Sequence, residues 1–177
     1  MAARTLSLII FVLLAVSIVG CRQGQEQEDS EKIEIRTNVP PADARKLWHY
    51  FMRKNHHGEW GTWPDTKGLL QGELPHGKLV EIFVNDIALE ASASGADVLP
   101  PGSCIVKRNY LADTTLTRLT VMYKVEGYDK ETNDWFWAQY RQTGLVEMAG
   151  KVPGCIECHL KVADNDYLFI HQLNPTY

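Results

Sequence analysis

Basic residues are in the minority in this chain. Its 177 residues include 18 lysines and arginines against 22 aspartates and glutamates, a formal net charge of −4. No basic patch interrupts this balance, so no nucleic-acid partner is expected. Long apolar runs are also scarce. The longest, residues 6–19, is apolar except for two serines. It has 14 residues, whereas a membrane-spanning helix needs about 20.

That apolar run lies at the N-terminus. Arg4 precedes it, and Ile18-Val19-Gly20-Cys21 resembles a bacterial lipoprotein cleavage box. An ordinary secretory signal that happens to contain a cysteine is the alternative. We expect a lipoprotein signal peptide over residues 1–20, lipidation of Cys21, and a flexible polar linker over residues 21–40. The protein would then be exported and held by lipid on the periplasmic face of a bacterial membrane, without spanning it.

Cysteine is scarce too, with four in the chain. A zinc site needs a second pair of ligands at similar spacing, and none is present. A redox dithiol is expected in a βαβ unit, and the order of elements here is different. Cys21 is assigned to lipid above, and Cys155 and Cys158 are assigned to haem below. Only Cys104 is left, so no structural disulfide is expected. We predict that Cys104 is a small buried apolar residue, with a reactive or iron-binding thiol as the alternative.

The remaining two cysteines belong to Cys155-Ile156-Glu157-Cys158-His159, which has the spacing of a c-type haem attachment site. In such a site each cysteine adds to one vinyl group of the porphyrin, and the histidine is the proximal iron ligand. The motif predicts one covalent haem c on Cys155 and Cys158, with His159 bound to its iron. Glu157 is expected to point outward.

Small electron-transfer cytochromes c usually have a distal methionine downstream of the haem motif. Here no methionine follows His159, and Met52, Met122 and Met148 all lie upstream. A His/Met electron-transfer centre is therefore not expected. A five-coordinate iron, open on its distal side, would suit small ligands such as nitric oxide, carbon monoxide or hydroxylamine. Helical-bundle cytochromes also carry a C-terminal haem motif, but this sequence lacks their four amphipathic helices.

The hydrophobic pattern predicts an α+β domain, an antiparallel β-sheet with packed helices and the haem motif after the sheet. A helix is expected over residues 42–54, with Leu47, Tyr50 and Phe51 at helical spacing, and a short one over residues 85–93. Aromatic residues at 135–137 would occupy both faces of a strand. Core packing or a dimer interface is the first explanation for these side chains, and haem contact is the second. Alternation predicts strands over residues 78–85, 103–110, 116–125 and 135–140.

Several ordered motifs resemble the cytochrome P-460 family. They are Pro75-His76-Gly77, Phe83-Val84-Asn85, Gly102 to Lys107, Met122-Tyr123-Lys124, Gly127-Tyr128-Asp129, Asp134 to Ala138 and the terminal Cys155 to His159.

The resemblance covers about residues 42–172 and implies a haem domain over residues 41–177. It implies a periplasmic mono-haem c protein with a mostly antiparallel β domain, often a homodimer. Some members oxidise hydroxylamine, passing electrons to an acceptor that the sequence does not identify. A related branch, the cytochromes c′-beta, binds nitric oxide. An electron carrier with an unidentified sixth ligand is the third possibility.

The resemblance also implies a role for Lys107. In the hydroxylamine-oxidising members, a lysine in a Gly-x-x-x-x-Lys stretch bonds to a haem meso carbon, and Gly102 to Lys107 matches that stretch. The attack requires a neutral amine, so burial beside the porphyrin should lower the pKa of Lys107. Ile105 would share its strand face. A solvated surface lysine is the alternative.

One position departs from the family. Its catalytic members have a carboxylate shortly after the haem histidine, thought to accept protons, whereas this chain has Lys161 two residues after His159. Asp164 or Asp166 could substitute if the chain folds back over the haem, although solvated loop positions are the simpler expectation. His76 could line the pocket or hydrogen-bond a loop. The other histidines, expected to be structural or solvated, are His49, His56, His57 and His171.

Overall fold

The computed structural model describes residues 39–54, 56–169 and 171–173. The described residues from Pro40 onward form one compact unit. The signal peptide, Cys21 and nearly all of the predicted linker lie outside the described residues, so those expectations remain predictions.

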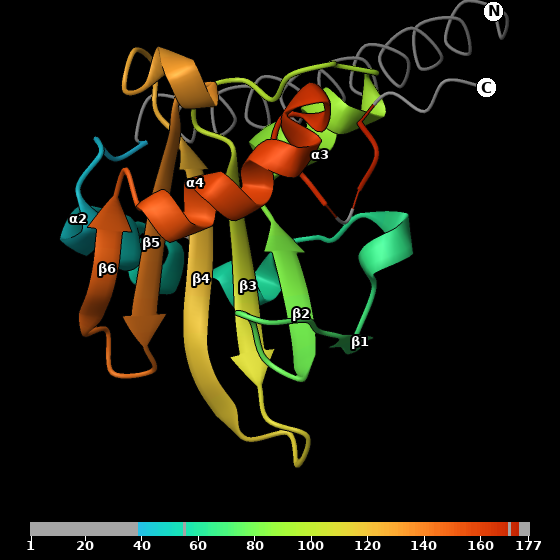
Figure 1. Ribbon diagram of the computed structural model, residues 1–177, viewed down its shortest axis with the longest axis vertical. Helices are drawn as coiled ribbons and strands as arrows, with labels where there is room; N and C mark the ends of the chain where they lie inside the picture. The colour runs from blue at the N-terminus through green and yellow to red at the C-terminus, as the bar shows by residue number, and fades with distance from the viewer. Residues whose placement is uncertain (1–38, 55, 170, 174–177) are drawn as a thin grey trace, which may run out of the picture. The chain divides into compact units, whose positions relative to one another are not determined.

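The centre of the domain is a six-stranded antiparallel sheet whose strands follow one another in chain order (Figure 1). The predicted α+β class is confirmed. Each of the four predicted strands is present to within one residue at either end. Two edge strands, β1 and β6, were not predicted. The strands are β1 (Leu70–Gln71), β2 (Leu79–Val84), β3 (Cys104–Tyr110), β4 (Leu116–Lys124), β5 (Trp135–Arg141) and β6 (Val146–Gly150).

One face of the sheet is covered by the first helical segment. Asp43 caps it by accepting hydrogen bonds from the backbone N–H groups of Arg45 and Lys46 at 3.0 and 2.9 Å. The predicted helix at 42–54 exists, but it is α-helical only over α2 (Ala44–His49) and continues as a π-helix, η1 (Tyr50–Lys54). Leu47, Tyr50 and Phe51 of this segment are buried, as predicted. The ring of Tyr50 packs on Tyr123 of the sheet, and the ring of Phe51 packs on Tyr140.

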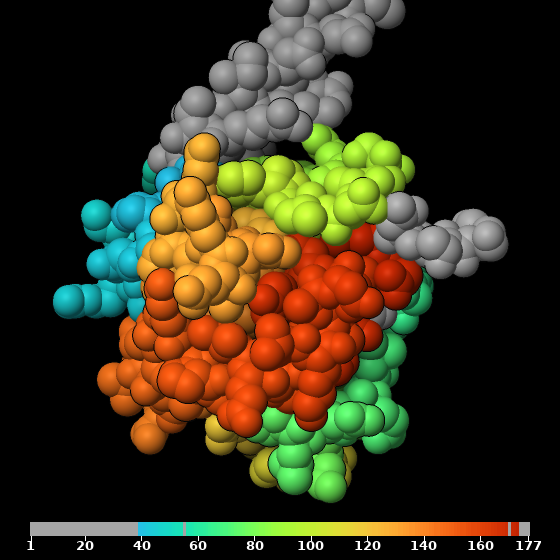
Figure 2. Space-filling view, turned by 45° about the horizontal axis from the view of Figure 1, so that its top comes forward, coloured from blue at the N-terminus to red at the C-terminus, as the bar shows by residue number. Residues whose placement is uncertain are grey.

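The opposite face carries α3 (Asp86–Ala93), α4 (Pro153–His159) and the 3-10 segment η5 (Leu160–Asn165). In Figure 1, α4 crosses in front of the strands, and in Figure 2 the orange-to-red surface of α4 and η5 covers the centre of its face. Below them lies a core that includes Ile82, Val84, Ile105, Trp135 and Trp137. The haem motif is therefore held against one face of the sheet. The remaining short 3-10 helices are η2 (His57–Glu59), η3 (Pro64–Thr66) and η4 (Lys130–Thr132).

Core packing accounts for the aromatic stretch in β5. Trp135, Phe136 and Trp137 are all buried within this single chain, with the two tryptophans on the α4 side of the sheet. Cys104 is also fully buried, as predicted. It lies on the other face of β3 from Ile105, because successive strand residues alternate between faces.

Candidate functional site

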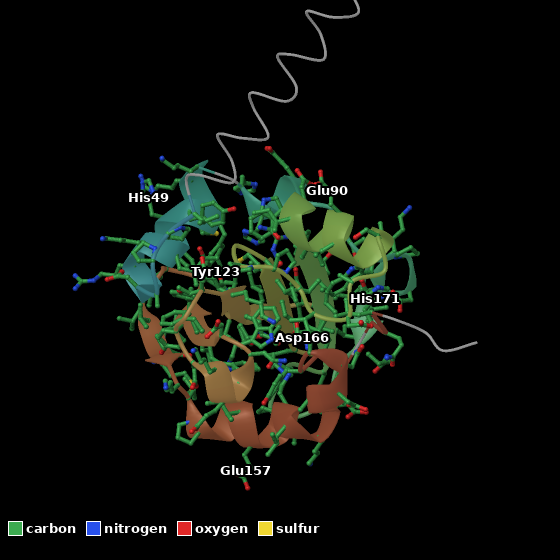
Figure 3. The ribbon with its side chains drawn as sticks, turned by 90° about the horizontal axis from the view of Figure 1, so that it is seen from above. His49, Glu90, Tyr123, Glu157, Asp166 and His171 are labelled. Carbon is green, nitrogen blue, oxygen red and sulfur yellow. The ribbon has the colours of Figure 1, made fainter. Side chains whose placement is uncertain are left out.

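Helix α4 brings the three residues of the attachment motif to one side. Pro153 stands in its first turn, where a proline costs no hydrogen bond. Cys155, Cys158 and His159 follow at i, i+3 and i+4, a spacing that aligns side chains on a helix. Both thiols are free and half-buried, and His159 is buried. Glu157 is exposed and points away from the domain, as predicted (Figure 3).

His159 is oriented by a backbone carbonyl. Its Nδ1–H donates to the Tyr167 carbonyl oxygen at 2.7 Å, which leaves the Nε2 lone pair available to a metal. Burial lowers the pKa of His159, so the ring is held in the neutral, ligating form. The rings of Trp137 and Phe169 lie against it, with centroids 4.8 and 5.1 Å away.

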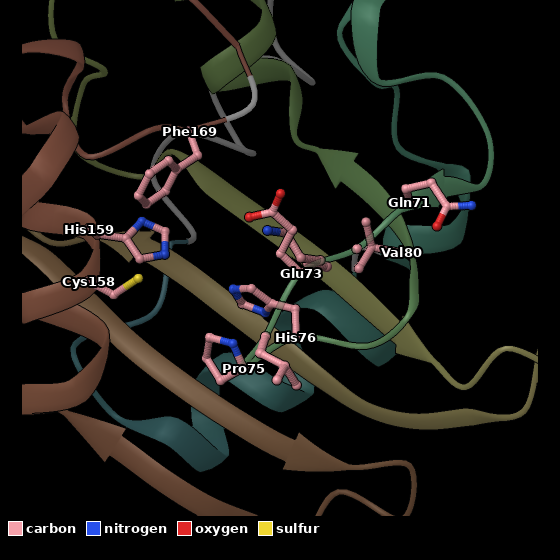
Figure 4. Close-up of a pocket in the computed structure, with 11 residues that line it drawn as sticks. Gln71, Glu73, Pro75, His76, Val80, Cys158, His159 and Phe169 are labelled. Atoms are coloured by element: carbon pink, nitrogen blue, oxygen red, sulfur yellow. The ribbon is translucent and has the colours of Figure 1, made fainter.

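Two cavities meet at His159. The larger, about 460 Å³, lies between α4 and the sheet and has apolar walls that include Ile105, Met122 and Trp137. The second, about 320 Å³, is bounded by residues 71–76, Val80 and Phe169 (Figure 4). Both are within the size range of cofactor pockets. They share five lining residues, namely Pro75, His76, Lys107, Cys158 and His159.

Lys107 is one of the shared lining residues. Strand β3 positions it between Ile82 of β2 and Thr120 of β4, on the same face as Ile105. Burial lowers the pKa of Lys107 to about 8, so the neutral amine is more accessible than in an ordinary lysine although the ammonium form still dominates at pH 7. Lys107 is half-buried in the cavity wall, and its covalent link to haem stays a prediction.

His76 lines both cavities, one of the two roles that the sequence left open, and its hydrogen bonds go to strands β3 and β4 and not to a loop. Its Nδ1 lies 3.2 Å from Asn109 Oδ1 and 3.3 Å from Thr120 Oγ1. Burial, reinforced by the positive charge of Lys107, lowers the pKa of His76 to about 4. Its imidazole is therefore neutral at physiological pH.

The carboxylates considered as a substitute base do not line these cavities. Asp164 is exposed, as expected, but the expectation of a solvated Asp166 is wrong. Its carboxylate is buried against the Lys124 ammonium, with Nζ–O distances of 2.5 and 2.6 Å. It also accepts hydrogen bonds from the backbone N–H of Leu99 and from Trp135 Nε1. Asp166 is thus committed to holding the C-terminal segment on the sheet.

The remaining histidines are mainly structural. His57 is buried between Phe51 and Arg108, whereas His49 is exposed. His171 stacks on Trp63 with a centroid separation of 4.6 Å and contacts Asp65.

The residues of the site fit a covalently attached haem. Two free thiols and a neutral imidazole lie on one side of α4, facing an apolar cavity. Arg118 brings a positive charge to the wall of the larger cavity, where it suits the propionate groups of a porphyrin. Trp137 Nε1 is buried and has no hydrogen-bond partner within the described part of the chain, so an acceptor supplied by a cofactor would satisfy it.

Two residues that contact His159 were not among the predicted site residues. For Trp137, core packing or an interface was the first expectation and haem contact the second, and the strand alternation that places it on the face of Ile105 is the signal that favours the second. No sequence pattern indicates that Phe169 lies beside His159, because its position depends on the turn that follows η5.

The fold and this donor set define a haem protein. The family model for cytochrome P460 matches residues 59–170, which is more than half of the sequence, and the chain belongs to this family. No curated protein matches the sequence. Export is general in the family. Within the described ranges, the structure contains no helix of the length and apolarity that a bilayer crossing requires.

Proposed function

We propose that this protein is a c-type haem oxidoreductase that oxidises hydroxylamine or a related small nitrogen compound. Cys155 and Cys158 hold the cofactor and His159 binds its iron. The observation that carries the proposal is the position of Lys107, which lines the same cavities as Cys158 and His159. This placement supports a lysine–porphyrin bond, the bond that the family resemblance associates with hydroxylamine oxidation.

The haem supplies the one-electron chemistry, and the residues of the chain hold, orient and shield it. The Tyr167 carbonyl fixes the ring of His159. Ile105, Met122 and Trp137 form an apolar wall that excludes water. Oxidation of hydroxylamine releases protons, and His76 is the neutral base that lines both cavities. Electrons leave to an external acceptor.

The site of action follows from the N-terminal segment. We place the protein on the periplasmic face of a bacterial membrane, anchored through lipidated Cys21, with residues 21–40 as a linker to the haem domain. A homodimer is the proposed assembly, on the strength of the family resemblance.

Electron transfer is the second candidate function, and one observation favours it. His76 and His159 approach each other across the shared part of the two cavities, with ring centroids 6.4 Å apart. A second axial imidazole would give a six-coordinate iron suited to electron relay.

The test is turnover of hydroxylamine by the haem-loaded protein with an artificial electron acceptor. We expect turnover by the wild type and at least a tenfold loss in Lys107→Met. Lys130→Met, which removes an exposed lysine, serves as the matched control and should behave as the wild type. If the fully loaded wild type gives no turnover, the enzyme assignment is wrong. Nitric oxide binding to the ferrous protein without turnover would then identify a gas-binding protein.

A further inference from the structure

His76 and His159 reach into the pocket from opposite sides. His159 comes from α4, and His76 comes from the loop between β1 and β2. Figure 4 shows the two imidazoles pointing toward one another, with Cys158 beside them. The ring planes are nearly perpendicular, at 87°. Both histidines line both cavities, so the two rings stand where the cavities meet.

A buried amide fixes the proton of His76. Asn109 Nδ2 donates to the carbonyl oxygens of Lys107 and Arg118 at 3.1 and 3.3 Å, so the amide oxygen faces His76. That oxygen accepts a hydrogen bond, and His76 must therefore carry its proton on Nδ1. The lone pair then lies on Nε2. His159 is held in the same tautomer by Tyr167, and this support at Nδ1 is the usual arrangement behind a metal-ligating histidine.

The loop that carries His76 is tightly seated. A Cβ atom at Gly77 would lie 2.3 and 2.4 Å from the backbone oxygen and nitrogen of Tyr110, and one at Gly72 would lie 2.1 Å from the oxygen of Gly77. Only glycine permits these approaches. His76 is therefore held against β3 by backbone packing as well as by its hydrogen bonds.

The separation of the two rings distinguishes two roles for His76. Two imidazoles bound through Nε2 to one metal, each at about 2 Å, have ring centres about 6 Å apart. A histidine that hydrogen-bonds to a ligand already on the metal would stand roughly 3 Å farther away. The observed 6.4 Å matches direct coordination by both rings.

We propose that His76 Nε2 is the sixth ligand of the haem iron in the resting protein, opposite His159. This inference rests on the haem site of the proposed function. A small nitrogen compound then reaches the iron only by displacing His76, whereas electron transfer requires no displacement.

The test is the spin state of the ferric haem-loaded protein, measured by visible absorption and electron paramagnetic resonance. We expect a low-spin, six-coordinate wild type and a high-spin His76→Ala. Free imidazole should return His76→Ala to low spin. His49→Ala, which removes an exposed histidine outside the cavities, is the matched control and should remain low-spin.

Two results would overturn the proposal. One is a high-spin ferric wild type, which decides the question even if His76→Ala folds poorly. The other is a His76→Ala variant that is folded, haem-loaded and still low-spin, because another side chain would then be the ligand. Haem content is measured separately by the pyridine haemochrome assay. A wild type without haem contradicts both the proposed function and this ligation, whereas a loaded high-spin protein contradicts only the ligation.

Discussion

At the scale of single residues, buried histidines govern the response of this domain to acid. His57 is 1% exposed, donates from Nδ1 to the Phe51 carbonyl oxygen and accepts from Arg108 Nε through Nε2. Burial, together with the charge of Arg108, lowers the pKa of His57 to about 4, against an unfolded value of 6.5. Between these values the unfolded chain binds a proton that the folded protein does not. Stability therefore falls as pH drops from 6.5 toward 4.

We predict that His57→Gln makes stability less dependent on pH in this range. The wild type should lose up to about 3 kcal/mol more than the variant between pH 6.5 and pH 4. The measurement is urea unfolding at several pH values, with the exposed His49→Gln as the control. Equal pH slopes for His57→Gln and the wild type would show that His57 is not held neutral by the fold.

The sequence could suggest Cys155, Cys158 and His159 as an attachment site because these residues are neighbours in the chain, and the structure shows that they line one cavity. Lys107 required the family resemblance, and the structure added its place in the wall of both cavities. The approach of His76 to His159 and the pairing of Asp166 with Lys124 could not be predicted. These contacts join residues that are far apart in the sequence, and no local pattern records which distant side chain a buried polar group will meet.

At the scale of secondary-structure elements, a buried ion pair ties the segment after α4 to strand β4. Lys124 and Asp166 have side chains that are 3% and 0% exposed. Asp166 directly precedes Tyr167, whose carbonyl orients His159. The pair therefore supports the orientation of His159 as well as the fold.

We predict that Asp166→Asn lowers the unfolding free energy by about 3–5 kcal/mol, because it leaves the Lys124 ammonium buried without a counter-charge. The double variant Lys124→Met with Asp166→Asn should recover much of this loss, since neither charge remains. Chemical denaturation of the loaded protein measures both.

Glu147→Gln is the matched control, since it breaks the more exposed ion pair with Arg141 and should cost less than about 1 kcal/mol. A cost for Asp166→Asn as small as that of this control would contradict the structural role of the buried pair.

The central strands were predictable because their burial alternates. In β2, Val80, Ile82 and Val84 are buried while the residues between them are only half-buried. Strand β6 has no buried residue, and β1 has two residues, so neither presents an apolar face for the sequence to reveal. The π-helical end of the first helical segment was also missed, because its apolar spacing is compatible with an α-helix.

At the scale of the whole molecule, the proposed function needs export and an anchor. We predict that the wild type, expressed in a bacterial host, fractionates with membranes and incorporates labelled fatty acid. Cys21→Ser should do neither, because it removes the thiol that carries the lipid. Cys104→Ala serves as the control, since Cys104 is buried in the domain and should not affect membrane association. A wild type found in the soluble periplasmic fraction would contradict the anchor.

The sheet, α4 and the two cavities fit a haem protein, and our central proposal is that it holds one haem covalently. The most direct test is mass spectrometry of proteolytic peptides from protein expressed with haem-maturation machinery. We predict one haem on the peptide that carries Cys155 and Cys158, joined through the haem to the peptide that carries Lys107. Haem held by the cysteines alone would contradict the lysine bond and favour gas binding or electron transfer. A peptide without haem would contradict the account as a whole.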